Sequence, residues 1–114
     1  MAGADESAQG AVEVAFVTAP DPETATGIAR ALVEERLAAC VNLVPAVRSI
    51  YRWEGRVQEE SEILLIVKTR AEHAAELEAR VRALHPYEVP ELLRVTVAGG
   101  SAAYLGWVLR ETAR

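Results

Sequence analysis

The order of hydrophobic patterns along the chain predicts an α+β fold of the ferredoxin-like type, βαββαβ, with an extra C-terminal helix. Strand-like alternation and helical spacing take turns along the sequence, and one tight turn joins two consecutive strands. The length of 114 residues suits one domain, and 51% hydrophobic with 25% charged residues is normal for a globular protein. We therefore expect a single domain over residues 11–114, preceded by a flexible tail at 1–10 with little apolar surface to bury.

The first strand should begin at Val12, where apolar residues start to recur at every second position. Asp21-Pro22-Glu23 then predicts a helix start, since an Asp side chain accepts from free N–H groups and Pro suits the first helical position. This helix should run from Pro22 to about Ala38. Its apolar stripe at helical spacing, which we expect to pack on a sheet, consists of Ala25, Ile28, Ala29, Leu32, Val33 and Leu37.

A long β-hairpin is predicted next, with arms at Cys40–Trp53 and Val57–Lys68 and a turn at Glu54-Gly55. Pro45 cannot donate a ladder hydrogen bond, so we expect a bulge or a sheet edge there. Both arms exceed the usual strand length of about five or six residues, and two short helices cannot cover so much sheet. Something else should therefore cover the tip of the hairpin.

Charged side chains follow the outer part of this hairpin. Its register places Arg48 and Arg52 on the same face as Glu59, within reach of diagonal cross-strand pairing. These charges can form a solvated ladder that contributes little to stability. Alternatively, they can specify how a neighbouring subunit docks.

The second half of the chain predicts a helix, a strand and a final helix. Thr69-Arg70-Ala71-Glu72 matches a capping box, and Pro86 ends the helix that follows. The last strand should cover 92–97, and Ser101 after Gly99-Gly100 is a plausible cap for a helix over 102–112. The apolar stripe of the second helix is Ala74, Leu77, Val81 and Leu84.

Composition argues against several classes of partner. The formal charge of −5 repels nucleic acid, and no run of about 18 apolar residues predicts a membrane span. The single cysteine, Cys40, excludes an intramolecular disulfide and a four-cysteine zinc site. Residues 1–10 lack the basic and apolar stretches of a secretory signal. We therefore expect a cytoplasmic protein that binds neither nucleic acid nor membrane.

The two histidines predict at most one weak metal site. His73 falls on the polar side of the second helix and should be solvated. His85 ends that helix, where imidazole is favourable, but with oxygens of Tyr87, Glu88 and Glu91 it could also hold a divalent ion.

Cys40 and Lys68 are the other side chains with possible chemistry. Cys40 lies between apolar neighbours, which favours a small buried thiol over a catalytic nucleophile. Lys68, the only lysine, ends an apolar run and could pair with Glu91 or Glu60, receive an anionic ligand, or extend to solvent. No constellation indicates an enzyme.

Several ordered motifs cover nearly the whole chain after residue 11. They are Thr18-Ala19-Pro20, the segment 35–42 (ERLAACVN), the segment 49–55 (SIYRWEG), the segment 85–92 (HPYEVPEL) and the segment 104–107 (YLGW). Together they resemble the CutA divalent-cation-tolerance family. The resemblance implies a ferredoxin-like fold similar to PII signalling proteins, assembled as a homotrimer through the long hairpins.

The resemblance also implies a role in tolerance to divalent cations, copper in particular. The ligands proposed in the family are a cysteine, here replaced by Val17, and two adjacent histidines, here Leu84 and His85, so only His85 is kept. The family also has a cleft between subunits. By position, the candidates to line it here are Cys40, Trp53, Lys68, His85, Tyr87, Pro90 and Glu91.

Two functions therefore follow from the sequence. The first is a cytoplasmic trimer that takes part in divalent cation (copper) tolerance through low-affinity metal binding at His85. The second is a PII-like signalling or scaffold trimer that binds a small anion at Lys68 in its inter-subunit cleft, with an indirect role in metal response.

Overall fold

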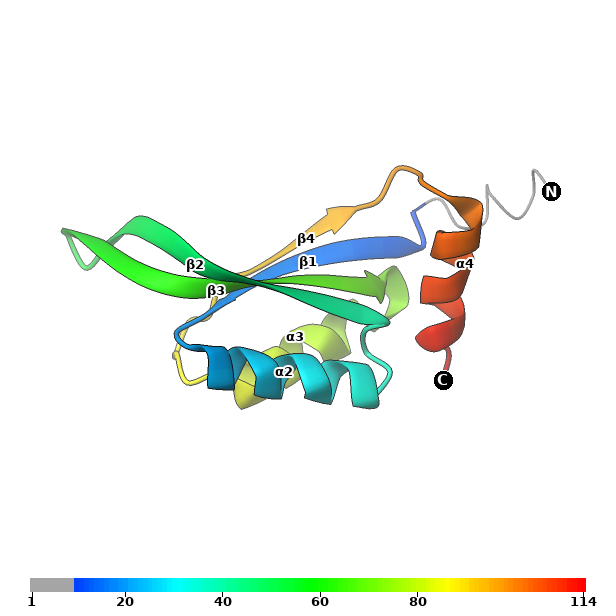
Figure 1. Cartoon of the computed structure of the whole chain (residues 1–114), viewed down its shortest axis with the longest axis horizontal. Helices are drawn as coiled ribbons and strands as arrows, with labels where there is room; N and C mark the ends of the chain where they lie inside the picture. Colours follow the sequence, from blue (N-terminus) through cyan, green and yellow to red (C-terminus); the bar gives the residue numbers. More distant parts are fainter. Residues whose placement is uncertain (1–9) are drawn as a thin grey trace.

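The computed structural model describes residues 10–114 and has the α+β architecture expected from the sequence (Figure 1). The expected tail at 1–10 lies outside the described residues except for Gly10, whose N–H donates to the Val97 carbonyl at 3.5 Å. In chain order the elements are β1 (Val12–Ala19), α2 (Pro22–Glu34), β2 (Cys40–Trp53), β3 (Arg56–Arg70), the 3-10 turn η1 (Ala71–His73), α3 (Ala74–Leu84), β4 (Leu92–Thr96) and α4 (Ala102–Glu111).

The four strands form one antiparallel sheet in the order β2-β3-β1-β4, the arrangement of a ferredoxin-like domain. Helices α2 and α3 lie together on one face of the sheet, and α4 stands at the end where β1 begins (Figure 1). We call the face under α2 and α3 the closed face and the opposite one the open face. The sheet edges are β2 and β4.

The main core fills the closed face. Alternate residues of the two central strands point into it, so that Val17 of β1 lies opposite Leu65 of β3, and both are fully buried. From the helices, Leu32 of α2 and Leu77 and Val81 of α3 complete this cluster, also fully buried. The stripes predicted for both helices are thus confirmed in their central positions.

The hairpin of β2 and β3 extends well past the helices (Figure 1), which accounts for the molecule's long axis of 51 Å against 24 and 23 Å. Glu54 and Gly55 form its turn with positive φ angles of 49° and 79°. The register shifts between Val44 and Val47, so the bulge expected at Pro45 is confirmed, and β2 is also an edge strand.

Helix α2 begins as predicted but ends four residues earlier than its apolar pattern suggests. The Asp21 carboxylate accepts from the Thr24 N–H at 2.7 Å. At the other end, Arg36 has φ 61°, and the N–H groups of Arg36 and Leu37 donate to the carbonyls of Val33 and Leu32. This is the Schellman pattern, in which Arg36 occupies the left-handed position that usually holds Gly.

The predicted capping box at Thr69 is wrong. Strand β3 continues to Arg70, which pairs with Val12, and helix α3 begins only at Ala74 after a 3-10 turn. The Thr69 hydroxyl is buried and donates to the Leu37 carbonyl at 2.6 Å. A tertiary contact therefore uses the side chain that the local sequence pattern assigned to a helix cap.

Helix α4 starts where predicted, with the Ser101 hydroxyl accepting from the Tyr104 N–H at 3.3 Å. Its Leu105 and Val108 form a second, smaller cluster with Val12 and Ala39. This cluster covers only the end of the open face.

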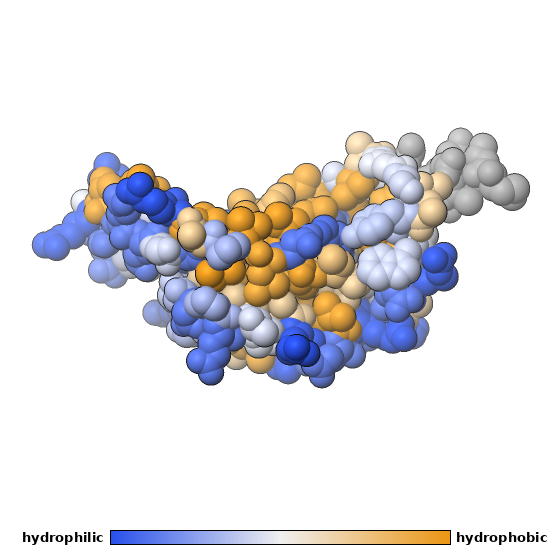
Figure 2. All heavy atoms as spheres, viewed as in Figure 1, coloured by the Kyte–Doolittle hydropathy of each residue, from blue (hydrophilic) through white to orange (hydrophobic). Residues whose placement is uncertain are grey.

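The rest of the open face carries apolar side chains that the single chain leaves exposed, and Figure 2 shows an apolar area over the middle of the sheet. The register places Val44, Leu93 and Val95 on this face, and Leu93 is 60% exposed.

At the hairpin, Arg48 forms the expected ion pair with Glu59 between two exposed side chains. No helix of residues 10–114 is long and apolar enough to cross a bilayer.

Candidate functional site

The candidate residues lie in three separate places on one chain. Cys40 and Lys68 are directly opposite each other at the α4 end of the sheet, whereas His85 and Tyr87 lie near the end of β1. Trp53 is at the hairpin tip. The Tyr87 hydroxyl contacts Glu62 of β3, which is six residues from Lys68 on the same strand, so the first two places are separated by about 20 Å. A single chain does not bring these candidates together.

His85 is buried and uses both ring nitrogens in hydrogen bonds. Its Nε2 lies 2.7 Å from the Thr18 carbonyl oxygen, so this nitrogen must carry the proton and donate. Its Nδ1 accepts from the Tyr87 N–H at 3.1 Å. No lone pair is therefore left for a metal ion, and the imidazole fixes the segment after α3 against the end of β1 instead.

An acidic group of side chains lies next to this histidine. The Tyr87 hydroxyl is 3.2 Å from Glu62, whose side chain is buried, and the Tyr87 and His85 rings are 4.7 Å apart. Partial burial, then the Glu62 charge and hydrogen bond, raise the pKa of Tyr87 to about 12. Burial and then the Glu62 charge raise the pKa of Glu91, which follows the half-buried Pro90. We call Glu62, Tyr87 and Glu91 the acidic cluster.

Negative charge continues from this cluster along the hairpin. The hydroxyl of Tyr51 on β2 bonds to Glu60 of β3, and this bond is the largest cause that raises the pKa of Tyr51. Glu60 also contributes to the raised pKa of Tyr87. These contacts at this end of the open face therefore join phenol and carboxylate groups. Within residues 10–114, no basic side chain takes part in them.

The Cys40–Lys68 pair has a different character. The Lys68 ammonium nitrogen lies 3.9 Å from the Cys40 sulfur, and both side chains are half-buried. Within residues 10–114, Lys68 has no ion pair, so of the alternatives for this side chain the pairing with Glu91 or Glu60 is not formed. Partial burial and then the Cys40 thiol raise the pKa of Tyr104 on α4. The same helix packs against Ala39, the residue before Cys40.

Trp53 and His73 complete the set of candidates. Trp53 ends β2 at the tip of the hairpin, which extends past the helices (Figure 1), and it is 50% exposed. His73 was expected to be solvated, but this is wrong, because it is half-buried and its Nε2 donates to the Thr112 carbonyl at 2.6 Å. The contact joins residues far apart in sequence, so helical spacing alone could not predict it.

Glu62 and Tyr104 are the neighbours that sequence reasoning missed. Glu62 starts the apolar run of β3, and a carboxylate at the border of such a run was a usable signal for a buried acid. Tyr104 was predicted to lie on the final helix, but only the packing of α4 places it near Cys40. No local pattern indicates that contact.

Comparisons with known proteins decide the family. The family model of the CutA1 divalent ion tolerance protein matches residues 13–111. The chain belongs to the CutA1 family. The divalent-cation tolerance protein CutA of Thermus thermophilus is 53% identical over 100 residues, which span 88% of this chain and 97% of that one. A solved structure of that bacterium's protein has a TM-score of 0.88 and covers 90% of this chain.

Relatives in animals are longer. Protein CutA of Mus musculus is 48% identical over 103 residues, which cover 90% of this chain but 58% of the mouse protein. The chain thus spans a little over half of that relative. The resemblance to the CutA family and the expected α+β fold are confirmed.

The donor set does not fit a copper centre of the kind expected from the CutA resemblance. Within residues 10–114, no three His, Cys, Asp or Glu side chains are grouped so that they could hold a metal ion. Val17 is buried in the core, and Leu84 packs against it. His85, the one ligand kept, offers no free nitrogen.

Proposed function

We propose that this CutA1-family chain acts as a homotrimer in divalent-cation tolerance, as a cytoplasmic binding protein and not as an enzyme. A divalent cation such as copper would be taken at low affinity where subunits meet, through oxygen atoms of the acidic cluster. The observation that carries this proposal is the hydrogen bond of the Tyr87 hydroxyl to buried Glu62 at 3.2 Å. The Glu62 charge, after burial, also raises the pKa of Glu91, and an added positive charge would relieve this repulsion.

The incomplete ligand set supports low affinity and a shared site. Two carboxylates and a phenol offer hard oxygen donors, but they are too few for tight binding by one chain. The open apolar face and the projecting hairpin supply a reason for subunits to meet, because large apolar surfaces left exposed favour association. A neighbouring subunit would then add the remaining ligands to the acidic cluster.

A binding role agrees with the positions of the nucleophile and the histidines. Cys40 lies beside Lys68, while His73 bonds to Thr112 and His85 to Thr18, so neither imidazole is placed as a base for the thiol. The free thiol also suits a reducing compartment.

Assembly is tested by the solution mass. Light scattering at micromolar concentration should give about three times the chain mass of 12.3 kDa. A mass near that of one chain would contradict the trimer and with it a shared site.

Metal binding is tested by calorimetric titration with copper(II) of the wild type, Glu62→Gln and His85→Ala. We expect weak binding that Glu62→Gln removes, and electron paramagnetic resonance of the bound copper without nitrogen splitting, because oxygen atoms are the ligands. Nitrogen splitting that disappears in His85→Ala would restore the imidazole as the ligand. Absence of binding heat in the wild type would reject direct metal binding altogether.

One observation favours the second candidate, a PII-like trimer that takes a small anion. Lys68 carries a half-buried positive charge with no carboxylate in ion-pair range within residues 10–114. Such an ammonium can bind an anionic group of a ligand in the cleft. Titration with inorganic phosphate, compared between the wild type and Lys68→Gln, should then show binding only in the wild type, and equal heats would reject this candidate.

A further inference from the structure

The last helix is attached to the domain independently of the main core. Helix α4 buries two apolar side chains, Leu105 and Val108, and they pack with Val12 and Ala39. The main core between the closed face, α2 and α3 includes no residue of α4. The packing of the main core therefore does not depend on α4.

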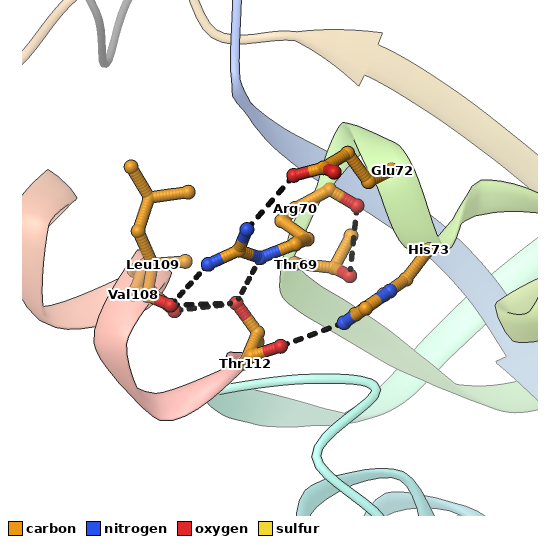
Figure 3. Close-up of polar contacts among 7 residues, drawn as sticks. All are labelled: Thr69, Arg70, Glu72, His73, Val108, Leu109 and Thr112. Carbon is orange, nitrogen blue, oxygen red and sulfur yellow. Dashed lines mark hydrogen bonds and ion pairs between the residues drawn. The ribbon is translucent and has the colours of Figure 1, made fainter. Parts of the chain in front are cut away.

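A group of polar contacts holds the C-terminal end of α4, where the last carbonyls of a helix lack partners inside the helix. Figure 3 shows Arg70 and His73 pointing at this end. Arg70 donates through Nε to the Thr112 hydroxyl at 3.1 Å and through Nη2 to the Leu109 carbonyl. His73 donates to the Thr112 carbonyl at 2.6 Å. We call Arg70, His73 and Thr112 the C-terminal anchor.

The segment that leads into the opposite end of α4 is held by few contacts. The last backbone bond before it runs from the Val97 N–H to the Val12 carbonyl at 3.1 Å. Within residues 10–114, no backbone hydrogen bond involves Ala98, Gly99 or Gly100. The space around Gly99 is open, since a Cβ there would meet no atom within 4 Å. A linker without backbone hydrogen bonds therefore precedes the helix, and the anchor holds the far end of the helix.

Helix α4 packs next to Cys40, because its Leu105 and Val108 share a cluster with Ala39, the residue before that cysteine. The Tyr104 ring lies 5.5 Å from that of Trp107, and the Cys40 thiol contributes, after partial burial, to the raised pKa of Tyr104. Cys40 in turn faces Lys68 at 3.9 Å. If α4 moved away, this half-buried thiol and ammonium would lose their cover on that side.

We infer that α4 is a hinged lid, held closed by the C-terminal anchor over Cys40 and Lys68, that opens while the main core stays folded. Opening needs the loss of a few polar contacts and of one small apolar cluster, so it belongs to the local fluctuations that precede global unfolding. Opening of α4 then controls the access of solutes to Cys40 and Lys68. The inference requires neither the metal nor the anion proposed above.

Thiol labelling tests the lid, because Cys40 is the only cysteine of the chain. We expect Arg70→Gln to raise the rate of Cys40 alkylation by N-ethylmaleimide about tenfold, since it removes charge-assisted bonds of the anchor. The matched control is Arg80→Gln, which removes the bidentate pair of α3 with Glu35, the C-cap residue of α2 (2.9 Å), but nothing at α4. A wild-type rate in Arg70→Gln, or equal acceleration in both variants, would overturn the lid.

Hydrogen exchange gives a second readout that does not depend on the thiol. Amides of 102–112 should exchange faster than those of 77–84 in the wild type, and Thr112→Val should accelerate only the former. This variant keeps the side-chain shape and removes the hydroxyl that receives Arg70. Equal protection of α4 and α3 in the wild type, or uniform loss in the variant, would mean that α4 opens only by global unfolding.

Discussion

The two faces of the sheet differ in how far one chain completes them. On the closed face, Leu65 and Val17 are fully buried under α2 and α3. On the open face, Leu93 and Val95 are at least half exposed, and only α4 covers one end. The same alternating strands supply both faces, so the difference lies in what covers them. The closed face holds the main core that stabilises the single chain. The open face leaves apolar side chains exposed, which favours binding of another surface there.

The largest effect is expected on the closed face. Leu65→Ala should lower the free energy of unfolding by about 3 kcal/mol, because Leu65 fills the space between β3 and the helices and would leave a cavity. Urea denaturation followed by circular dichroism, at a fixed chain concentration, measures this loss. The matched control is Leu93→Ala on the open face, which should cost under about 1 kcal/mol where the chain is monomeric. Equal losses in the monomer would erase the distinction between the faces.

The next effect concerns assembly through the hairpin. Trp53→Ala should weaken the proposed trimer by about 2 kcal/mol, because a half-exposed aromatic at an uncovered tip is a natural interface anchor. The midpoint of dissociation in dilution or denaturant series reports it. Val57→Ala trims an exposed apolar side chain at the same tip and serves as the control. An unchanged midpoint for Trp53→Ala would exclude the tip from the interface.

A smaller effect is expected at the margin of the closed face. Glu13 is buried on β1 and receives Arg94 of β4 at 2.7 Å, and Arg94 is 40% exposed. Glu13→Gln should cost about 1 to 2 kcal/mol, less than for a fully buried pair because solvent screens the guanidinium. Denaturation of Glu13→Gln beside the exposed-pair variant Glu59→Gln measures it. Equal stability of the two variants would show that burial adds nothing here.

The sequence predicted the elements whose signals are local. Asp21 caps α2 because its carboxylate accepts from an N–H group only three residues away. Pro45 marks a bulge because it has no N–H group to donate to the neighbouring strand. The pattern failed where tertiary contacts decided the outcome. Thr69 was assigned to a helix cap, but pairing of Arg70 with Val12 extended β3 and buried the hydroxyl. The end of α2 was missed because Arg36 replaces the glycine expected there.

The candidate site was less predictable than the fold. Counted from the turn alone, Cys40 would pair with Thr69; the bulge between Val44 and Val47 shifts the register by one residue and sets Cys40 opposite Lys68. The engagement of His85 with Thr18 crosses 67 residues, so no spacing rule indicates it. The same holds for Glu62 beside Tyr87, which depends on how the segment after α3 returns to β3.

The last effect is a pH dependence at the acidic end of the open face. Tyr87 keeps its proton in the folded chain up to a pKa of about 12, against an ordinary value of 10.0. Because the folded state binds this proton more tightly, Tyr87 contributes stability that is complete below about pH 10 and is lost as the pH rises towards 12. The tyrosinate absorbance of the wild type minus that of Tyr87→Phe, followed against pH, should show one tyrosine that ionises above its ordinary pKa.

Glu62→Gln separates the causes of this shift. After burial, the Glu62 charge is the largest contribution to the raised pKa of Tyr87, and Glu62 also raises the pKa of Glu91. Removing that charge should move the late ionisation back towards the ordinary value, whereas Glu88→Gln, on an exposed neighbour, should leave it in place. If Glu62→Gln leaves it unchanged, burial alone causes the shift. The acidic cluster would then lack the charge coupling on which its proposed affinity for a cation depends.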